Sequence, residues 1–239
     1  MPFDPLAVLD RETRALEAAL RAARADDALD APVPGCPGWS VAELGRHTGD
    51  VHRWARAALG STQPPGGSPV GPPDADVPEW YAAAAADLRS ALADTPADRA
   101  CWTFDRTDRT AAFWRRRQAH EAALHRWDVE TALGRPAALA AGTALDGLDE
   151  VLGMFLPRQV RLGRLAAGTA WVEVVPVETG APLPVADGPP AGPAAGAVHG
   201  PAEALLLLLW RRVGLDDPRL AVTGPVQEVL AVLDRPLTP

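Results

Sequence analysis

Apolar residues recur every three or four positions through most of the first 165 residues, which is the spacing of amphipathic helices. Proline- and glycine-rich stretches interrupt this pattern. Ser40 and Glu43 form an S-x-x-E capping box, which marks a helix N-terminus. The expected helices cover residues 5–27, 40–59, 78–95, 112–134 and 144–162. This part of the chain is therefore predicted to be a helical bundle.

The pattern changes near residue 165, where valine-rich and strongly apolar stretches replace the long amphipathic segments. Residues 168–180 alternate and residues 219–224 are rich in small apolar side chains, so both are expected to be strands. Residues 201–214 and 225–235 are expected to be helices, and residues 181–196 a connection without regular structure. This second part is therefore predicted to be a small α/β domain.

We expect two domains, a helical bundle over residues 1–165 and a small α/β domain over residues 166–239. The chain is long enough to bury a hydrophobic core in this arrangement. Residues 60–77 are rich in proline and glycine and are expected to be a loop between the second and third helices.

Charge and hydropathy exclude several classes of protein. The net charge of −8 argues against nonspecific binding of nucleic acid. The longest apolar run, residues 204–210, is far shorter than the ~20 residues that a membrane span needs, and the N-terminus lacks an apolar signal-peptide core. Cys36 and Cys101 stand alone, without metal-binding or redox spacing. We therefore expect a reduced, cytoplasmic protein with no membrane partner.

Glu121 and His125 lie four residues apart in the helix expected over residues 112–134, so they share one face, with Cβ atoms ~6 Å apart. Such a pair is either a salt bridge or two ligands of a metal ion. A catalytic metal site needs three protein ligands and an open position. His47 is the best third candidate, because facing helices of a bundle hold such sites. Two imidazoles and a carboxylate suit Zn2+, without excluding nickel, iron or manganese.

Two charged residues flank this pair on the same helix face. Arg117 lies one turn before Glu121 and is either its salt-bridge partner or an anchor for a carboxylate of a bound molecule. Asp128 lies one turn after His125 and is expected to orient its imidazole through a hydrogen bond.

The other candidates are weaker on spacing alone. His52, five residues after His47, is expected either to support the site or to lie on the surface. Glu43 forms a second E-x-x-x-H pair with His47, but it already has a capping role and further inward carboxylates for a two-metal site are missing. Cys36 lies in a proline–glycine loop without a convincing base partner, which favours a structural role. His199 precedes a helix in a glycine–alanine loop.

Two stretches together resemble a known family. These are VPGCPGWSVAELGRHTGDVHRWA, residues 33–55, and FWRRRQAHEAALHRWDVETALG, residues 113–134. They resemble the mycothiol-dependent maleylpyruvate isomerase family of actinobacteria, within the DinB-like superfamily of metal-binding four-helix bundles. Residues 198–212, VHGPAEALLLLLWRR, fit the family more loosely. The resemblance covers most of the chain and implies a DinB-like bundle followed by a small C-terminal α/β domain.

The resemblance also implies a site. Its metal ligands match His47, Glu121 and His125, and Asp128 matches a position that follows the last ligand. An arginine implicated in activity is matched by Arg212. The implied cofactors are a divalent metal, Zn2+, and mycothiol as thiol cofactor or cosubstrate. Arg117 and His52 are the residues that we expect to contact the cofactor.

The implied chemistry is the addition of a metal-activated thiolate to an electrophilic small molecule. Release of the thiol after bond rotation makes the protein a cis–trans isomerase, whereas retention of the thiol makes it an S-transferase. The alternative is a noncatalytic module that binds a metal or a small ligand. For the enzyme, the expected partners are a low-molecular-weight thiol and a small-molecule electrophile. We expect a monomer or a weak dimer.

Overall fold

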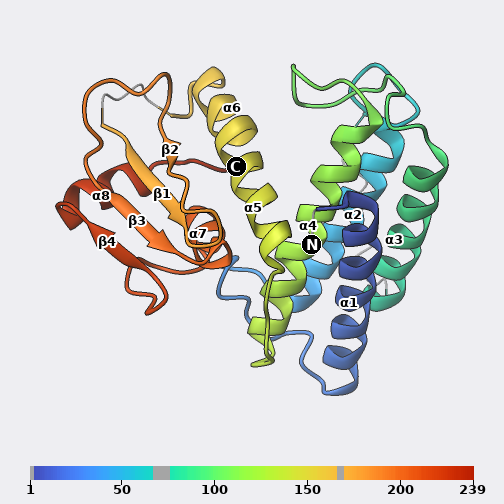
Figure 1. The fold of residues 1–239 in the computed structure, drawn as a ribbon. Helices are drawn as coiled ribbons and strands as arrows, with labels where there is room; N and C mark the ends of the chain where they lie inside the picture. Colours follow the sequence, from blue (N-terminus) through green and yellow to red (C-terminus); the bar gives the residue numbers. More distant parts are fainter. Residues whose placement is uncertain (1–2, 67–75, 166–169) are drawn as a thin grey trace. The chain divides into compact units, whose positions relative to one another are not determined.

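The computed structural model describes residues 3–66, 76–165 and 170–239. The chain forms two compact units, which divide between Leu139 and Ala140 (Figure 1). Half of the loop expected over residues 60–77, residues 67–75, lies outside the described residues, so its role stays open.

The first unit is a four-helix bundle. Its helices are α1 (Pro5–Ala25), α2 (Val41–Ala58), α3 (Val77–Asp94) and α4 (Ala111–Ala132). Helices α1 and α2 each pack against both α3 and α4. These helices are the first four that the periodicity predicts, and their ends agree with the expected ones to within two residues.

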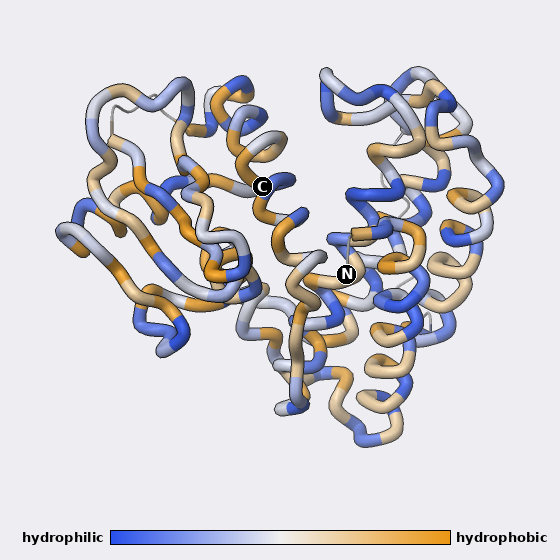
Figure 2. The backbone as a smooth tube through the Cα atoms, in the orientation of Figure 1, coloured by the Kyte–Doolittle hydropathy of each residue, from blue (hydrophilic) through white to orange (hydrophobic). Residues whose placement is uncertain are grey.

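Local signals explain where these helices begin and end. At the start of α1, the Asp4 side chain accepts hydrogen bonds from the first-turn N–H groups. At the end of α4, Gly134 has a φ of +64° and ends the turn that follows the helix. Leu9, Leu16 and Leu20 form one fully buried face of α1. Figure 2 shows the resulting alternation of hydrophobic and hydrophilic positions along the bundle helices.

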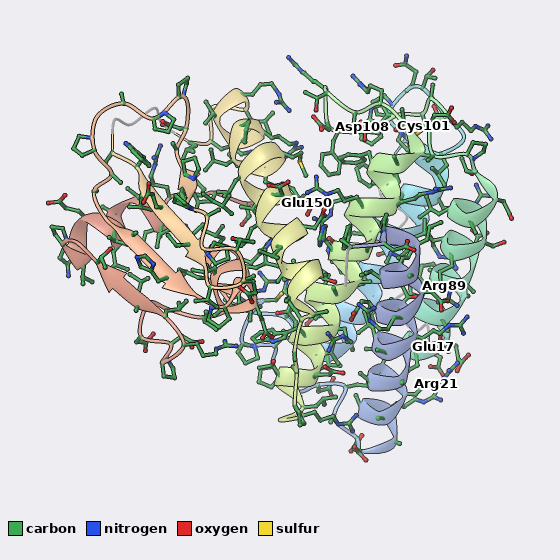
Figure 3. The ribbon with its side chains drawn as sticks, in the orientation of Figure 1. Glu17, Arg21, Arg89, Cys101, Asp108 and Glu150 are labelled. Carbon is green, nitrogen blue, oxygen red and sulfur yellow. The ribbon has the colours of Figure 1, made fainter. Side chains whose placement is uncertain are left out.

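The outer surface of the bundle carries ion pairs instead. Arg21 pairs with Glu17 one turn earlier on α1 and, at 3.3 Å, with Glu79 of α3. Arg89 of α3 differs from these exposed pairs, because it reaches inward and donates a hydrogen bond of 2.9 Å to the buried Thr13 hydroxyl of α1. Glu17, Arg21 and Arg89 lie along this α1–α3 face in Figure 3. Exposed pairs of this kind contribute little to stability, about 0–1 kcal/mol each.

The second unit combines helices with a four-stranded sheet. Its elements are α5 (Ala141–Glu150), a π-helical turn η1 (Val151–Phe155), α6 (Leu156–Arg161), β1 (Val172–Pro176), β2 (Leu183–Val185), β3 (Ala197–Gly200), α7 (Ala202–Leu209), β4 (Ala221–Thr223) and α8 (Val226–Leu233). The strand order is β2-β1-β3-β4. The central pair, β1 and β3, is parallel, and both edge strands are antiparallel to their neighbours. A helical bundle followed by a small α/β domain is the predicted fold class, which is confirmed.

Two strands were not expected from the sequence. Residues 181–196 contain β2, and His199 lies on β3 instead of in a loop. Both strands are too short to show alternation, at three and four residues. Pro184 sits in β2, which tolerates proline because it is an edge strand with one side free of ladder hydrogen bonds.

The division between the units also differs from the expected one. The helical segment of α5 and α6 was assigned to the bundle, but it belongs to the second unit, so the division precedes residue 140. The reason is packing, because α5 contacts α7, and α7 in turn contacts β1 and β3. Helical periodicity shows that a segment is a helix but not which core it covers.

Helix α7 supplies much of the core of the second unit. Its residues Leu205–Leu209 are all buried. None of the described helices combines the length and the apolar character needed to cross a lipid bilayer.

Candidate metal centre

His47 of α2 meets Glu121 and His125 of α4 inside the bundle unit. The Nε2 atom of His47 lies 3.7 Å from Oε1 of Glu121, and Nε2 of His125 lies 3.3 Å from the same oxygen. The donor atoms of all three residues lie within 4.8 Å of one another. The two imidazole rings are 5.6 Å apart and nearly perpendicular. Two nitrogens and one carboxylate oxygen thus face a common point.

The start of α2 determines where His47 lies. The Ser40 hydroxyl accepts from the Glu43 N–H at 3.2 Å, and the Glu43 carboxylate accepts from the Ser40 N–H at 2.7 Å, which is the predicted capping box. The hydrogen bonds that the Glu43 carboxylate accepts from the Ser40 N–H and the Ser40 hydroxyl lower the pKa of Glu43. Trp39 presents its ring to the His47 imidazole at 4.7 Å. Glu43 therefore caps the helix, and the structure does not bring it into the donor set.

Two residues of α4 contact Glu121 and His125 and orient their side chains. Nη2 of Arg117 lies 2.8 Å from Oε2 of Glu121, which leaves Oε1 directed at the imidazoles. Oδ2 of Asp128 lies 3.0 Å from Nδ1 of His125. Nδ1 of His125 can donate its proton to Asp128, which leaves Nε2 on the side of Glu121. These are the contacts that the spacing on the helix predicts.

Burial and charge act in opposite directions on the pKa values of Glu121 and His125. Burial alone would raise the pKa of Glu121, but the charge of His125, hydrogen bonds from both histidines and the Arg117 charge hold it well below its usual value. Burial alone would lower the pKa of His125, but Glu121 and a hydrogen bond to Asp128 raise it well above its usual value. The carboxylate is therefore ionised at neutral pH, whereas His125 must release a proton before its Nε2 atom can bind a metal ion.

The donor set fits a divalent ion of the zinc type. Imidazole nitrogen and carboxylate oxygen are ligands that Zn2+ accepts, and three protein ligands leave a position for another molecule. A simple salt bridge between Glu121 and His125 would not need a second imidazole directed at the same oxygen. The His47 side chain is 39% exposed, whereas those of Glu121 and His125 are 14% and 12% exposed. The site is thus anchored on its α4 side and open on its α2 side.

His52 lies in the interior and not on the surface. Its side chain is fully buried, and Nδ1 lies 2.6 Å from Oε1 of Gln118 on α4. Burial lowers the pKa of His52 to about 4, so the ring is neutral at physiological pH. Nε2 of His52 and Nε2 of Gln118 are buried without a protein partner. A direct contact of His52 with a cofactor stays a prediction.

Two further side chains are not members of the donor set. The buried ring of His120 stacks on Phe3 at 4.9 Å, and His120 does not join the donor set although it is adjacent to Glu121 in the chain. Arg212 belongs to the second unit, where Nη1 donates to the Trp210 carbonyl at 2.8 Å. Its role in activity stays a prediction.

Cys36 lies beside the candidate site, and its sequence position does not indicate this. Its Sγ atom lies 3.7 Å from Oδ2 of Asp128, the same oxygen that faces His125. Cys36, His125 and Asp128 form a second group of potential ligand atoms within 4.8 Å of one another. The only local signal was the position of Cys36 just before the cap of α2, and its partners are about 90 residues away in the chain.

Comparisons with known proteins give the following matches. The mycothiol maleylpyruvate isomerase N-terminal domain family matches residues 9–130, and the MDMPI C-terminal domain family matches residues 143–231. A crystal structure of the mycothiol-dependent maleylpyruvate isomerase superposes with a TM-score of 0.64 at 14% identity, over 92% of this chain and 91% of that chain. A histidine-to-alanine mutant of such an isomerase gives a TM-score of 0.63 at 13% identity, with the same coverage. No curated protein matches the chain.

Proposed function

Because the chain belongs to the mycothiol maleylpyruvate isomerase family, we propose that it is a metal-dependent enzyme that uses mycothiol to attack an electrophilic small molecule. The observation that carries this proposal is the convergence of two imidazole Nε2 atoms on one carboxylate oxygen, in His47, His125 and Glu121. A divalent ion bound there would lower the pKa of a thiol ligand, which makes the nucleophilic thiolate available at neutral pH.

The protein side chains have separate tasks in this proposal. Asp128 keeps the His125 tautomer that presents Nε2, and Arg117 keeps Glu121 turned toward the histidines. The partly exposed side of His47 admits the thiol and the electrophile. Arg212 is proposed to take part in activity, on the strength of the family resemblance. The thiol cosubstrate and the free cysteines need a reducing compartment, so we propose a cytoplasmic location.

Two reactions use the same nucleophile. In an isomerisation the thiol adds to a cis double bond, the resulting single bond rotates, and elimination returns the free thiol with the trans product. In an S-transfer the thiol stays attached to the product. Maleylpyruvate, added with mycothiol to the metal-loaded protein, separates the two by mass spectrometry, because only S-transfer increases the product mass by that of the thiol.

Metal analysis tests the site directly. We expect about one divalent ion per chain in the purified protein, loss of that ion in His125→Ala, and retention in His199→Ala, which removes an imidazole of β3 outside the donor set. Mycothiol binding, measured by titration calorimetry, should follow metal content. Equal metal in all three proteins would reduce Glu121 and His125 to an ordinary helix pair, and bound metal without thiol dependence would favour the noncatalytic binding module.

Substitutions of Asp128 and of its neighbour Cys36 should weaken metal binding to different degrees. Asp128→Asn should weaken metal affinity about 10–100-fold, because the amide no longer supports the His125 tautomer as a carboxylate does. Cys36→Ser keeps a hydrogen-bond donor beside Asp128 and should change the affinity less than Asp128→Asn does. Competition with a chromogenic chelator measures both. An Asp128→Asn protein with wild-type affinity would remove this residue from the site.

A further inference from the structure

A cavity of about 510 Å3 lies within the second unit, between the helical segment of η1 and α6 and the region of strand β2. Its walls are mainly apolar. Leu152, Leu156 and Val160 line it from the helical side, and Leu183 and Ala186 line it from the other. The volume is within the range of small-ligand sites, roughly 300–1,000 Å3. None of its described lining residues belongs to the bundle unit.

The helical wall is distorted where it lines the cavity. The Leu156 N–H donates to the carbonyl of Val151, five residues earlier, as in a π-helix. Pro157 follows directly, and a proline ring in a continuing helix lacks an N–H and crowds the carbonyl four residues earlier. π-helical turns occur frequently at functional sites.

Gly153 lies on this π-helical turn and lines the cavity. A Cβ atom added to Gly153 would meet no heavy atom within 4 Å, and its φ is not in the left-handed region. Neither packing nor backbone conformation therefore requires glycine here, although glycine destabilises a helix interior relative to alanine. The missing side chain keeps this wall open.

The charges at the cavity are carboxylates. Asp149 and Asp187 line it, whereas none of its described lining residues is basic. Nη2 of Arg235 lies 2.7 Å from Oδ2 of Asp187, so the charge of Asp187 is already balanced. Asp149 is exposed and supplies one negative charge at the edge of an apolar space.

We infer that this cavity binds a small organic cation, which has an apolar body that fills the space and a protonated amine that pairs with Asp149. The leucine and valine walls match the apolar body, and the carboxylate matches the ammonium group, which donates charge-assisted hydrogen bonds. The site uses none of the residues of the candidate metal centre, so the inference does not depend on the proposed catalytic function.

Three eight-carbon probes test this inference on the full-length protein: n-octylamine, 1-octanol and octanoate. They share an apolar chain and differ in charge at neutral pH. Titration calorimetry should show saturable binding of the amine, with an affinity about tenfold or more above that of octanoate, equivalent to about 1.4 kcal/mol.

Two variants locate the binding. Gly153→Leu fills the open wall and should weaken amine binding about tenfold or more, with Gly153→Ala intermediate. Asp149→Asn should remove the advantage of the amine over 1-octanol and leave 1-octanol binding unchanged. Glu228→Gln is the matched control, because Glu228 is an exposed carboxylate of α8 that does not line the cavity. Circular dichroism melting checks that each variant is folded.

The same titrations can overturn the inference. Lack of saturable binding by the amine, a preference for octanoate, or full amine affinity in folded Gly153→Leu would each exclude the site. If Gly153→Leu does not fold, Asp149→Asn decides, and an unchanged preference for the amine in that variant would refute the pairing.

Discussion

The two units build their interiors differently. The bundle buries several ionisable side chains among its described residues: Glu12, His52, Arg117, His120, Arg126 and Asp128. In the described part of the second unit, the buried ionisable side chain is Glu150. The core of this unit is formed largely by the leucine run of α7. Figure 2 shows this run among the most hydrophobic stretches of the chain.

The difference shows what a buried charge requires. Arg126 of α4 reaches both Glu12 of α1 and Glu130, one turn later on α4. A charge moved into a medium of low dielectric constant is stable only when it is paired and hydrogen-bonded. The bundle interior therefore depends on specific partners and on pH, whereas the second unit depends mainly on apolar packing.

The largest effect is expected from Arg126→Leu. This variant leaves the buried carboxylate of Glu12 without its buried partner, and the free energy of unfolding should fall by about 3–5 kcal/mol. Urea unfolding measures the change. Arg14→Leu is the control, because Arg14 and Asp10 form an exposed pair and its loss should change stability by less than about 1 kcal/mol. Similar small effects in both variants would contradict the distinction between the interiors.

Leu207→Ala should have a slightly smaller effect, about 3 kcal/mol, because it opens a space in the fully buried core of the second unit. The loss should be the same at about pH 7 and pH 5, since no ionisable group changes its environment. Leu162→Ala removes a leucine that is 46% exposed and should lose less than about 1 kcal/mol. Urea unfolding measures both losses. A strong pH dependence of the loss in Leu207→Ala would contradict the conclusion that the second unit depends mainly on apolar packing.

His52 should produce a pH effect in the bundle. Its pKa is about 4 in the folded protein, below the value of about 6.5 in an unfolded chain. The unfolded state therefore binds the proton first, so the stability is fully present above about pH 6.5 and is lost as pH falls toward 4. At pH 5 the loss from this residue is about 2 kcal/mol.

Comparison with a nontitrating variant isolates this contribution. His52→Gln keeps a donor for Gln118, so the stability advantage of the wild-type protein over this variant should shrink by about 2 kcal/mol between pH 7 and pH 5. His199→Gln, on β3, serves as the control. A constant difference across this pH range would show that His52 is not buried in its neutral form.

Much of the bundle could be predicted because its signals are local. Helix spans, the capping box at Ser40 and the shared face of Glu121 and His125 all depend on residues within a few positions of one another. In contrast, β2 and β3 are only three and four residues long, and their pairing with β1 stabilises them more than their own composition does.

Parts of the candidate site could not be predicted for a related reason. Cys36 contacts Asp128, and His52 contacts Gln118, through side chains that lie 92 and 66 residues apart in the chain. No periodicity within a segment encodes such contacts. They appear only when the loop before α2 and helix α2 itself pack against α4.

The sequence by itself determined the helices, their caps, the change to a small α/β domain and the pair Glu121–His125, because backbone geometry repeats over a few residues. Tertiary structure decided that His47 meets that pair, that α5 and α6 belong to the second unit, and that Gly153 lines a cavity. These outcomes depend on how whole elements pack, since packing brings together side chains that are distant in the chain.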